Sequence, residues 1–257
     1  MARTLCLTID NIGEAAEVGD GSFPPDAPLG AHFTVAVVGR LLDLLDRLDV
    51  PATFFVEALN ARVYPALLRE IVARGHELAC HGWQHEHWHG LTPAQEREIL
   101  ERCTHALNDL GVRPVGFRPP GGLVTAATPA LLRELGYRYH SPAGTSAGVA
   151  DGLAVLPFEW RTVDAFYRAP VFAGLRERYG AGASLRDGMV ERLDAATGPT
   201  VLVFHPMLLD EPDALAALGD VLAARADVEC VRMDALAERL LADPGAPAPV
   251  VDEATWA

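Results

Sequence analysis

The sequence is poor in cysteine and in basic residues, and each shortage excludes a class of protein. Its four cysteines, Cys6, Cys80, Cys103 and Cys230, are widely spaced, so neither a disulfide framework nor a zinc cluster is expected. Lys and Arg number 21 against 35 Asp and Glu, which gives a net charge of −14. Nucleic acid and anionic membrane surfaces are disfavoured as partners, because both bind clustered basic side chains.

Long hydrophobic runs are also missing. No stretch approaches the roughly 20 apolar residues that a membrane-spanning helix needs. The apolar stretch at the N-terminus is interrupted by Thr8 and ends at Asp10, which is too short for the hydrophobic region of a signal peptide. We therefore expect a cytoplasmic protein. Half of the residues are hydrophobic and 22% are charged, a composition typical of globular proteins.

Apolar runs typical of strands alternate with helical patterns along most of the chain. Strands are expected at residues 5–9, 52–56, 77–80, 115–117, 137–139, 154–158, 200–204 and 228–231. Helices are expected at residues 33–48, 64–74, 92–110, 128–136, 184–196, 212–224 and 234–242. Continuous apolar strands separated by helices indicate an α/β protein with a parallel sheet. A (β/α) barrel fits this length best, and a doubly wound sheet is the alternative, although no GxGxxG follows the first strand.

Three segments lack these patterns. Residues 13–31 and 141–152 are rich in glycine, proline and small residues, and the tail 243–257 contains three prolines within six residues. We expect a single catalytic domain over residues 1–242, followed by an irregular C-terminal tail.

Polar side chains follow four of the predicted strands. Asp10 ends the first strand, His81 and His85 follow the third, Arg118 follows the fourth, and His205 follows the strand at 200–204. Because active sites of parallel α/β proteins lie at the carboxyl ends of their strands, these side chains predict one site.

The segment 80–89 holds four of the nine histidines. Two imidazoles four residues apart on a helical turn face one side and can share a metal ion, which makes His81 and His85 candidate ligands. The alternative is a polar loop with incidental histidines. His87 and His89 are expected at the surface, and Trp83 either packs the loop or contacts substrate.

The other three side chains also have two interpretations each. Asp10 could cap a loop or act as a general base, and His205 could be a core histidine or a general acid. Arg118 could be a surface charge, or it could hold a carboxylate bidentately. The turn after it, which includes Pro120 and Gly121, is expected to be rigid and to line the pocket.

In this order, the motifs around Asp10, His81 to His85, Arg118 to Gly121 and His205 resemble the polysaccharide deacetylases over residues 3–235. That family of carbohydrate esterases has a distorted (β/α)7 barrel. The resemblance implies a metal-dependent amidohydrolase that removes acetyl groups from N-acetylated sugars. It assigns Asp10 as the base, His81 and His85 as metal ligands, Arg118 as the residue that orients the base, and His205 as the acid.

Two departures from the family pattern matter. The position of the usual second acid, a metal ligand, is Asn11, so the metal site lacks its carboxylate unless Glu14 supplies one. Gly82 follows the first histidine, where sugar deacetylases often have Ser or Thr. The His-Gly-Trp form is similar to the intracellular allantoinase-like and cyclic-imide hydrolase branch, some of whose members act with little or no bound metal. The stretch containing Trp160 and Asp164 would then line the pocket.

We therefore expect a hydrolase of a linear or cyclic amide-type C–N bond in a small N-acylated, ureide or imide substrate. A divalent metal, zinc first among them, is expected to be weakly bound or absent. The alternatives are a metabolite-tailoring enzyme that uses the same site without tightly bound metal, and a degenerate carbohydrate-binding protein. The resemblance also suggests a homo-oligomer.

Overall fold

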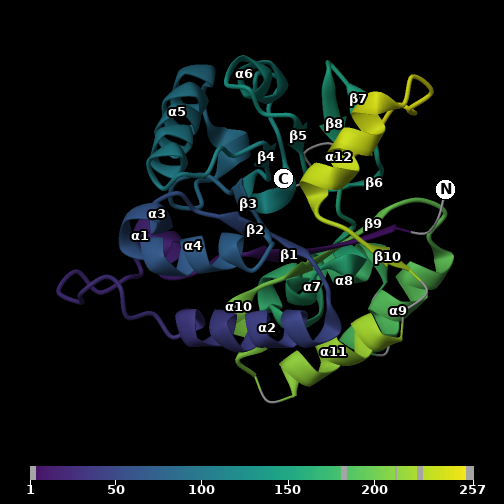
Figure 1. The fold of residues 1–257 in the computed structure, drawn as a ribbon, viewed down its shortest axis with the longest axis horizontal. Coiled ribbons are helices and arrows are strands. Elements are labelled where there is room, and N and C mark those ends of the chain that lie inside the picture. Colours follow the sequence, from purple (N-terminus) through teal and green to yellow (C-terminus); the bar gives the residue numbers. More distant parts are fainter. Residues whose placement is uncertain (1–3, 181–183, 212, 225–227, 253–257) are drawn as a thin grey trace.

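The computed structural model describes residues 4–180, 184–211, 213–224 and 228–252, and its centre is a curled parallel sheet (Figure 1). The parallel strands, in sheet order, are β9 (Thr200–Phe204), β1 (Thr4–Asp10), β2 (Ala52–Val56), β3 (Glu77–Cys80), β4 (Gly116–Phe117), β5 (Tyr139–His140) and β8 (Leu153–Val155). An isolated parallel bridge between Val163 and Val203 joins the segment after β8 to β9. The predicted (β/α) barrel class is confirmed, in a distorted form.

The remaining strands lie at the edges. β10 (Glu229–Cys230) pairs with the start of β1, and β7 (Gly148–Ala150) pairs antiparallel with β8. β6 (Gly144–Ser146) and β11 (Val250–Val251) form a separate antiparallel pair. The segment 141–152 and the tail were expected to be irregular, and that expectation was wrong for these strands. Glycine explains the pairing, since a Cβ on Gly144 would lie 2.4 Å from the Val250 carbonyl oxygen.

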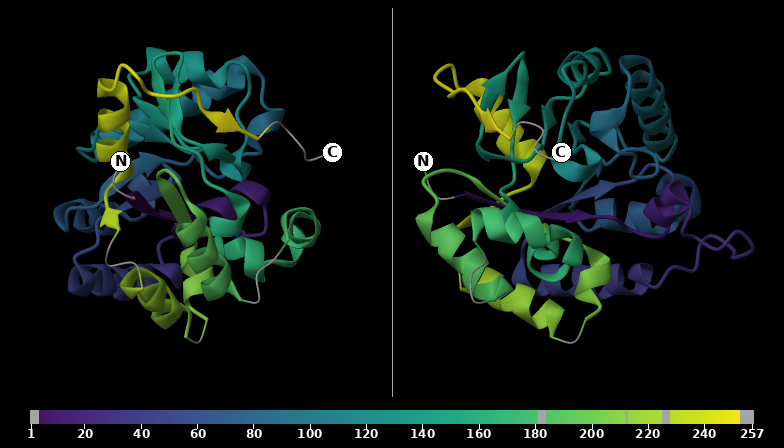
Figure 2. Two further views of the ribbon diagram at one scale, coloured as in Figure 1. Left: turned by 90° about the vertical axis from the view of Figure 1, so that its right-hand side faces the viewer. Right: turned by 180° about the vertical axis from the view of Figure 1, so that it is seen from behind.

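Helices cover the outer face of the sheet (Figures 1 and 2). The α-helices are α1 (Ala15–Asp20), α2 (Thr34–Leu48), α3 (Asn60–Val63), α4 (Pro65–Ala73), α5 (Pro93–Asp109), α6 (Thr128–Glu134), α7 (Asp164–Arg168), α8 (Ala173–Tyr179), α9 (Leu185–Ala195), α10 (Pro206–Leu209), α11 (Ala214–Ala223) and α12 (Met233–Ala242). Short 3-10 turns are η1 (Trp88–Gly90), η2 (Pro120–Gly122), η3 (Trp160–Thr162) and η4 (Pro170–Phe172). No helix of the described part is long and apolar enough to cross a bilayer.

The long predicted helices are present, with ends displaced by a few residues. α5 begins at the predicted capping box, in which Thr92 accepts from the Gln95 backbone and Gln95 accepts from the Thr92 backbone. The predicted start of the helix at 212–224 falls on Pro212, outside the described residues. The short helices α1, α7, α8 and α10 were not predicted, because four to seven residues carry too little periodicity to be recognised.

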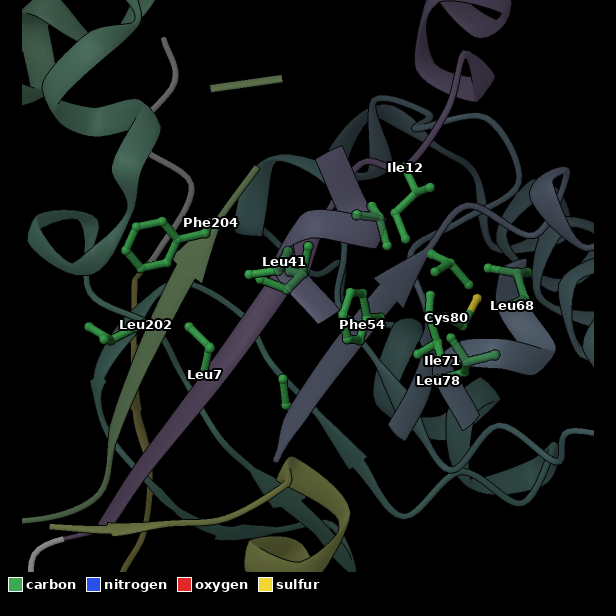
Figure 3. Close-up of a cluster of buried hydrophobic side chains, with 14 of the residues drawn as sticks. Leu7, Ile12, Leu41, Phe54, Leu68, Ile71, Leu78, Cys80, Leu202 and Phe204 are labelled. Atoms are coloured by element: carbon green, nitrogen blue, oxygen red, sulfur yellow. The ribbon is translucent and has the colours of Figure 1, made fainter. Parts of the chain in front are cut away.

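Strand alternation divides the core into two layers. Leu7, Phe54 and Leu202 belong to the layer between the sheet and the helices (Figure 3), whereas Cys6, Phe55 and Val201 belong to the layer inside the barrel. Successive side chains of a strand point to opposite faces. Residues at even spacings from Cys6 on β1, and from Val201 on β9, therefore face the barrel interior. The same alternation determines the direction of the polar side chains at the strand ends.

The cysteines do not form disulfides. All four are free, and Cys6, Cys80 and Cys103 are buried. These three pack as small hydrophobic side chains, while Cys230 is half-buried.

Glu77 lies buried at the start of β3, near the amino end of the barrel. Its carboxylate oxygens accept hydrogen bonds from the Thr53 hydroxyl at 2.7 Å, the Tyr139 hydroxyl at 2.8 Å and the Asp234 backbone N–H at 3.0 Å. Burial, together with the charge of Asp234, raises the pKa of Glu77 to about 7.

We predict that Glu77→Gln changes how stability depends on pH. The folded protein retains a proton on Glu77 that the unfolded chain, with an ordinary pKa of 4.5, has lost. Over the range from about pH 4.5 to about pH 7, Glu77 is ionised in the unfolded chain and protonated in the folded protein. The free energy of unfolding therefore falls as pH rises through this range. Urea denaturation at several pH values should show the variant gaining stability relative to the parent over this range.

The matched control is Glu98→Gln on the exposed face of α5, which should show no such trend. Parallel pH curves for the parent and Glu77→Gln would contradict the prediction.

Candidate active site

Four strand ends converge on one pocket. Asp10, His81, Arg118 and His205 follow the alternation that points inward from β1, β3, β4 and β9, and all four line a cavity of about 510 Å³. The cavity is lined by these four and by Asn11, His85, Glu86, His87, His89, Pro119, Pro120, Gly121, Gly122, Phe158, Trp160, Val163, Val171, Phe172 and Val203. The predicted pocket residues Pro120, Gly121 and Trp160 are among them, and so are the exposed His87 and His89 at its rim.

Arg118 is the buried cation of the site, with 1% of its surface exposed. Its Nη1 donates to Asp10 Oδ1 at 2.7 Å and to the Thr8 hydroxyl at 2.8 Å, while Nη2 donates to the Ser141 hydroxyl at 2.9 Å. The guanidinium lies over the Phe55 ring, 4.0 Å from its centroid. Burial lowers the pKa of Arg118, although the adjacent Asp10 carboxylate opposes that shift.

The predicted bidentate grip on Asp10 is therefore wrong in its geometry. Arg118 reaches a single oxygen of Asp10, because its other N–H groups bond Thr8 and Ser141. The second oxygen of Asp10, Oδ2, lies 3.9 Å from His81 Nε2. This arrangement fixes the carboxylate and leaves Oδ2 directed toward the histidine side of the pocket.

His81 and His85 lie side by side, with ring centroids 5.1 Å apart. His81 Nδ1 is 2.9 Å from the Arg118 carbonyl oxygen, which can only accept, so this nitrogen carries the proton and Nε2 carries the lone pair. Burial lowers the pKa of both histidines to about 3. Both imidazoles are thus neutral at pH 7, the form that binds metals.

The two histidines meet across a turn rather than along the predicted helical turn. Gly82 and His85 have positive φ values of 78° and 61°. Glu86, which the sequence analysis did not select, holds this turn by accepting the backbone N–H groups of Trp83 at 3.0 Å and Gln84 at 3.1 Å. A Cβ on Gly82 would lie 2.6 Å from Glu86 Oε2, so the carboxylate occupies the space of a side chain at position 82.

His205 is paired with Asp164. Its Nδ1 lies 2.5 Å from Asp164 Oδ1, and its backbone N–H donates to Asp164 Oδ2 at 2.7 Å. Burial alone would lower the pKa of His205, but the charge and hydrogen bond of Asp164 outweigh burial and raise it. Asp164, which was expected to line the pocket, is not among its lining residues. It orients His205 instead.

Trp83 also lies outside the pocket, which corrects its selection as a substrate contact. Its ring is buried, and the guanidinium groups of Arg102 and Arg62 lie 3.6 Å and 5.0 Å from its centroid. The ring therefore anchors the histidine turn to the helices outside the barrel.

Apart from Asp10, whose second oxygen lies 3.9 Å from His81 Nε2, the donors available to a metal are neutral. Asn11 Oδ1 is buried without a hydrogen-bond partner, and it lines the pocket together with His81 and His85. Glu14 is not placed to help, since Gly30 N–H and the Tyr64 hydroxyl donate to its two oxygens. Within the described ranges, no three His, Cys, Asp or Glu side chains form a group that could hold a metal. Two imidazoles and one amide oxygen fit a divalent cation, but without the carboxylate that offsets its charge.

The sequence of this chain is similar to a family model and to proteins of known name. Residues 25–140 match the sequence model of the family described as polysaccharide deacetylase. This match includes His81, His85 and Arg118, whereas Asp10 and His205 lie outside it. The peptidoglycan deacetylase of Helicobacter pylori is 29% identical over 128 residues, which is 49% of this chain and 44% of that protein. The peptidoglycan deacetylase-like protein FGM2 of Gibberella zeae is 38% identical over 105 residues, 40% of this chain and 31% of that protein. The matches thus span less than half of these curated relatives.

Solved structures match over a greater length. A Mycobacterium smegmatis protein described as a polysaccharide deacetylase is 30% identical with a TM-score of 0.79, over 98% of this chain and 94% of that one. Puue allantoinase, at 22% identity and a TM-score of 0.70 over 92% of this chain and 90% of that one, shares the fold. The inward-facing strand ends and the end-to-end match to the Mycobacterium smegmatis structure lead to one assignment: this chain belongs to the polysaccharide deacetylase family.

Proposed function

We propose that the protein hydrolyses an amide-type C–N bond in a small N-acylated, ureide or cyclic-imide substrate. The observation that carries this proposal is a pair of oriented titratable groups in one pocket, Asp10 held by Arg118 and His205 held by Asp164. Two titratable side chains that are oriented by different neighbouring residues can act as base and acid in one reaction. The relatives named as peptidoglycan deacetylases support a C–N hydrolase in particular.

In the proposed reaction, Asp10 takes a proton from a water molecule through the oxygen that Arg118 leaves free. The resulting hydroxide attacks the carbonyl carbon, and His205 donates a proton to the leaving nitrogen as the C–N bond breaks. The raised pKa of His205 favours the protonated form that an acid needs. Backbone N–H groups of the turn at Gly121 are proposed to stabilise the oxyanion.

A divalent metal, when bound, would polarise the water and the carbonyl. His81, His85 and Asn11 would hold it. The neutral donor set supports weak binding, in keeping with the allantoinase-like and cyclic-imide hydrolase branch, some of whose members act with little or no bound metal. The four free cysteines are in keeping with the proposed cytoplasmic location. The homo-oligomer stays a prediction of the resemblance.

We predict that Asp10→Asn and His205→Ala each lower kcat by roughly 10²–10⁴, the scale of losing a general base or acid. Turnover would be measured on a panel of N-acetylglucosamine oligomers, ureides and cyclic imides, and circular dichroism would confirm the fold. His105→Ala, at an exposed position on α5, is the matched control and should keep parental activity. Near-normal turnover in both site variants would refute the assignment.

We predict that Arg118→Lys does not preserve activity, because an ammonium on a flexible stem cannot hold Asp10, Thr8 and Ser141 together. Misplacement of the base should cost about 100-fold in kcat, with a smaller change in KM. A lysine variant with full activity would show that the positive charge alone is sufficient.

We predict that protein purified without added metal holds less than one equivalent, and that Asn11→Asp raises this content by restoring a charged ligand. Metal content would be measured by elemental mass spectrometry after dialysis against a chelator. This measurement tests both statements. Glu14→Gln is the control, and it should leave metal content unchanged because Glu14 is bonded to Gly30 and Tyr64. Stoichiometric zinc that survives dialysis of the parent protein would contradict the weakened site.

A further inference from the structure

The pocket has one polar face and one apolar face. Asp10, the histidines and Arg118 form the polar face. The apolar face consists of Phe158, Trp160, Val163, Val171, Phe172 and Val203, which come from the segment after β8, from η3, from η4 and from β9. None of these six side chains carries a charge.

The aromatic members of this face form a continuous wall. The rings of Phe158 and Trp160 have centroids 5.4 Å apart and stand nearly perpendicular, and Trp160 and Phe172 follow at 5.5 Å. Phe158 also lies beside the Arg118 guanidinium, 5.2 Å from ring centroid to Cζ. The wall therefore begins at the catalytic face and extends from it toward η4, where Val171 is 75% exposed.

The apolar face itself offers no charge that could pair with an anion. Among its described lining residues, Arg118 is the one permanently charged cation, and it is buried against Asp10, Thr8 and Ser141. A substrate carboxylate or phosphate at the apolar wall would lose its hydration without gaining an ion pair.

The size of the cavity, about 510 Å³, lies within the usual range for small-molecule sites. A ring-sized group on the wall would lie next to an amide carbonyl placed between Asp10 and His205. Sugar hydroxyls in the same position would find a single polar side-chain group among the six residues of the wall, the indole N–H of Trp160.

We propose that the substrate is an uncharged amide, ureide or cyclic imide that carries an apolar, ring-sized substituent beside the scissile bond, bound against Phe158, Trp160 and Phe172. The inference rests on the proposed function for the reacting group, and on the apolar wall for the substituent. Phe172 and Val171 are then specificity-determining residues.

Calorimetric binding to the parent protein tests the inference with a matched series of probes: succinimide, 2-phenylsuccinimide, its para-carboxyphenyl analogue and an N-acetylglucosamine dimer. We expect the phenyl compound to bind at least about ten-fold more tightly than succinimide, since even one methylene in an apolar pocket is worth roughly ten-fold or more. The carboxylate should remove this gain. Equal affinity for succinimide and its phenyl derivative, or tighter binding of the sugar, would overturn the proposal.

Two variants connect the preference to the wall. Phe172→Ala should reduce the phenyl preference several-fold, and Val171→Ser, at an exposed position that cannot disturb the core, should reduce it less. Val72→Ser, on the exposed side of α4, is the matched control and should preserve it. A phenyl preference unchanged in both wall variants would contradict the assignment.

Binding and turnover separate the two proposals. Tight binding of 2-phenylsuccinimide without hydrolysis of any probe would support the wall and count against the proposed reaction. Hydrolysis of succinimide and its phenyl derivative with equal KM would support the reaction and overturn the wall.

Discussion

A buried guanidinium needs partners on every side, and that requirement organises this molecule. Arg118 binds Thr8 and Asp10 from β1 and Ser141 after β5, and its own carbonyl accepts from His81. Loss of Asp10 would leave the guanidinium charge unpaired at the centre of the barrel, at a cost of several kcal/mol. Loss of Thr8, Ser141 or His81 would leave a donor or an acceptor unsatisfied, at a cost of about 1–3 kcal/mol. The strands are thus positioned by the same residue that positions the proposed base.

The elements that the sequence predicted well share a physical basis. Buried parallel strands leave continuous apolar runs in the sequence, and long helices leave a periodic pattern. Both can therefore be predicted from the sequence without knowledge of the tertiary contacts. Strand ends face a common edge, which made Asp10, His81, Arg118 and His205 recognisable as neighbours. The alternation of side chains then predicts their inward direction, and the structure follows it.

Other features depend on contacts that no local pattern contains. Asp164 lies 41 residues from His205, and tertiary contacts such as the bridge between Val163 and Val203 bring the pair together. Glu14 looked available in the sequence because it follows Asn11 closely, but Tyr64 and Gly30 engage it. Glu86 was not selected from the sequence, because its role depends on two backbone N–H groups and the missing side chain of Gly82.

The pairing of β11 with β6 ties the C-terminal segment to the wall of the pocket. The Ala143 carbonyl accepts from the Asp252 backbone N–H, the Gly144 N–H donates to the Phe158 carbonyl, and a Cβ on Gly122 would lie 2.9 Å from the Phe158 ring. A chain shortened before Val250 would leave β6 with an open edge, the type of surface through which strands of separate molecules associate. Removal of β11 would therefore affect colloidal behaviour and the backbone that supports the Phe158 side of the pocket together.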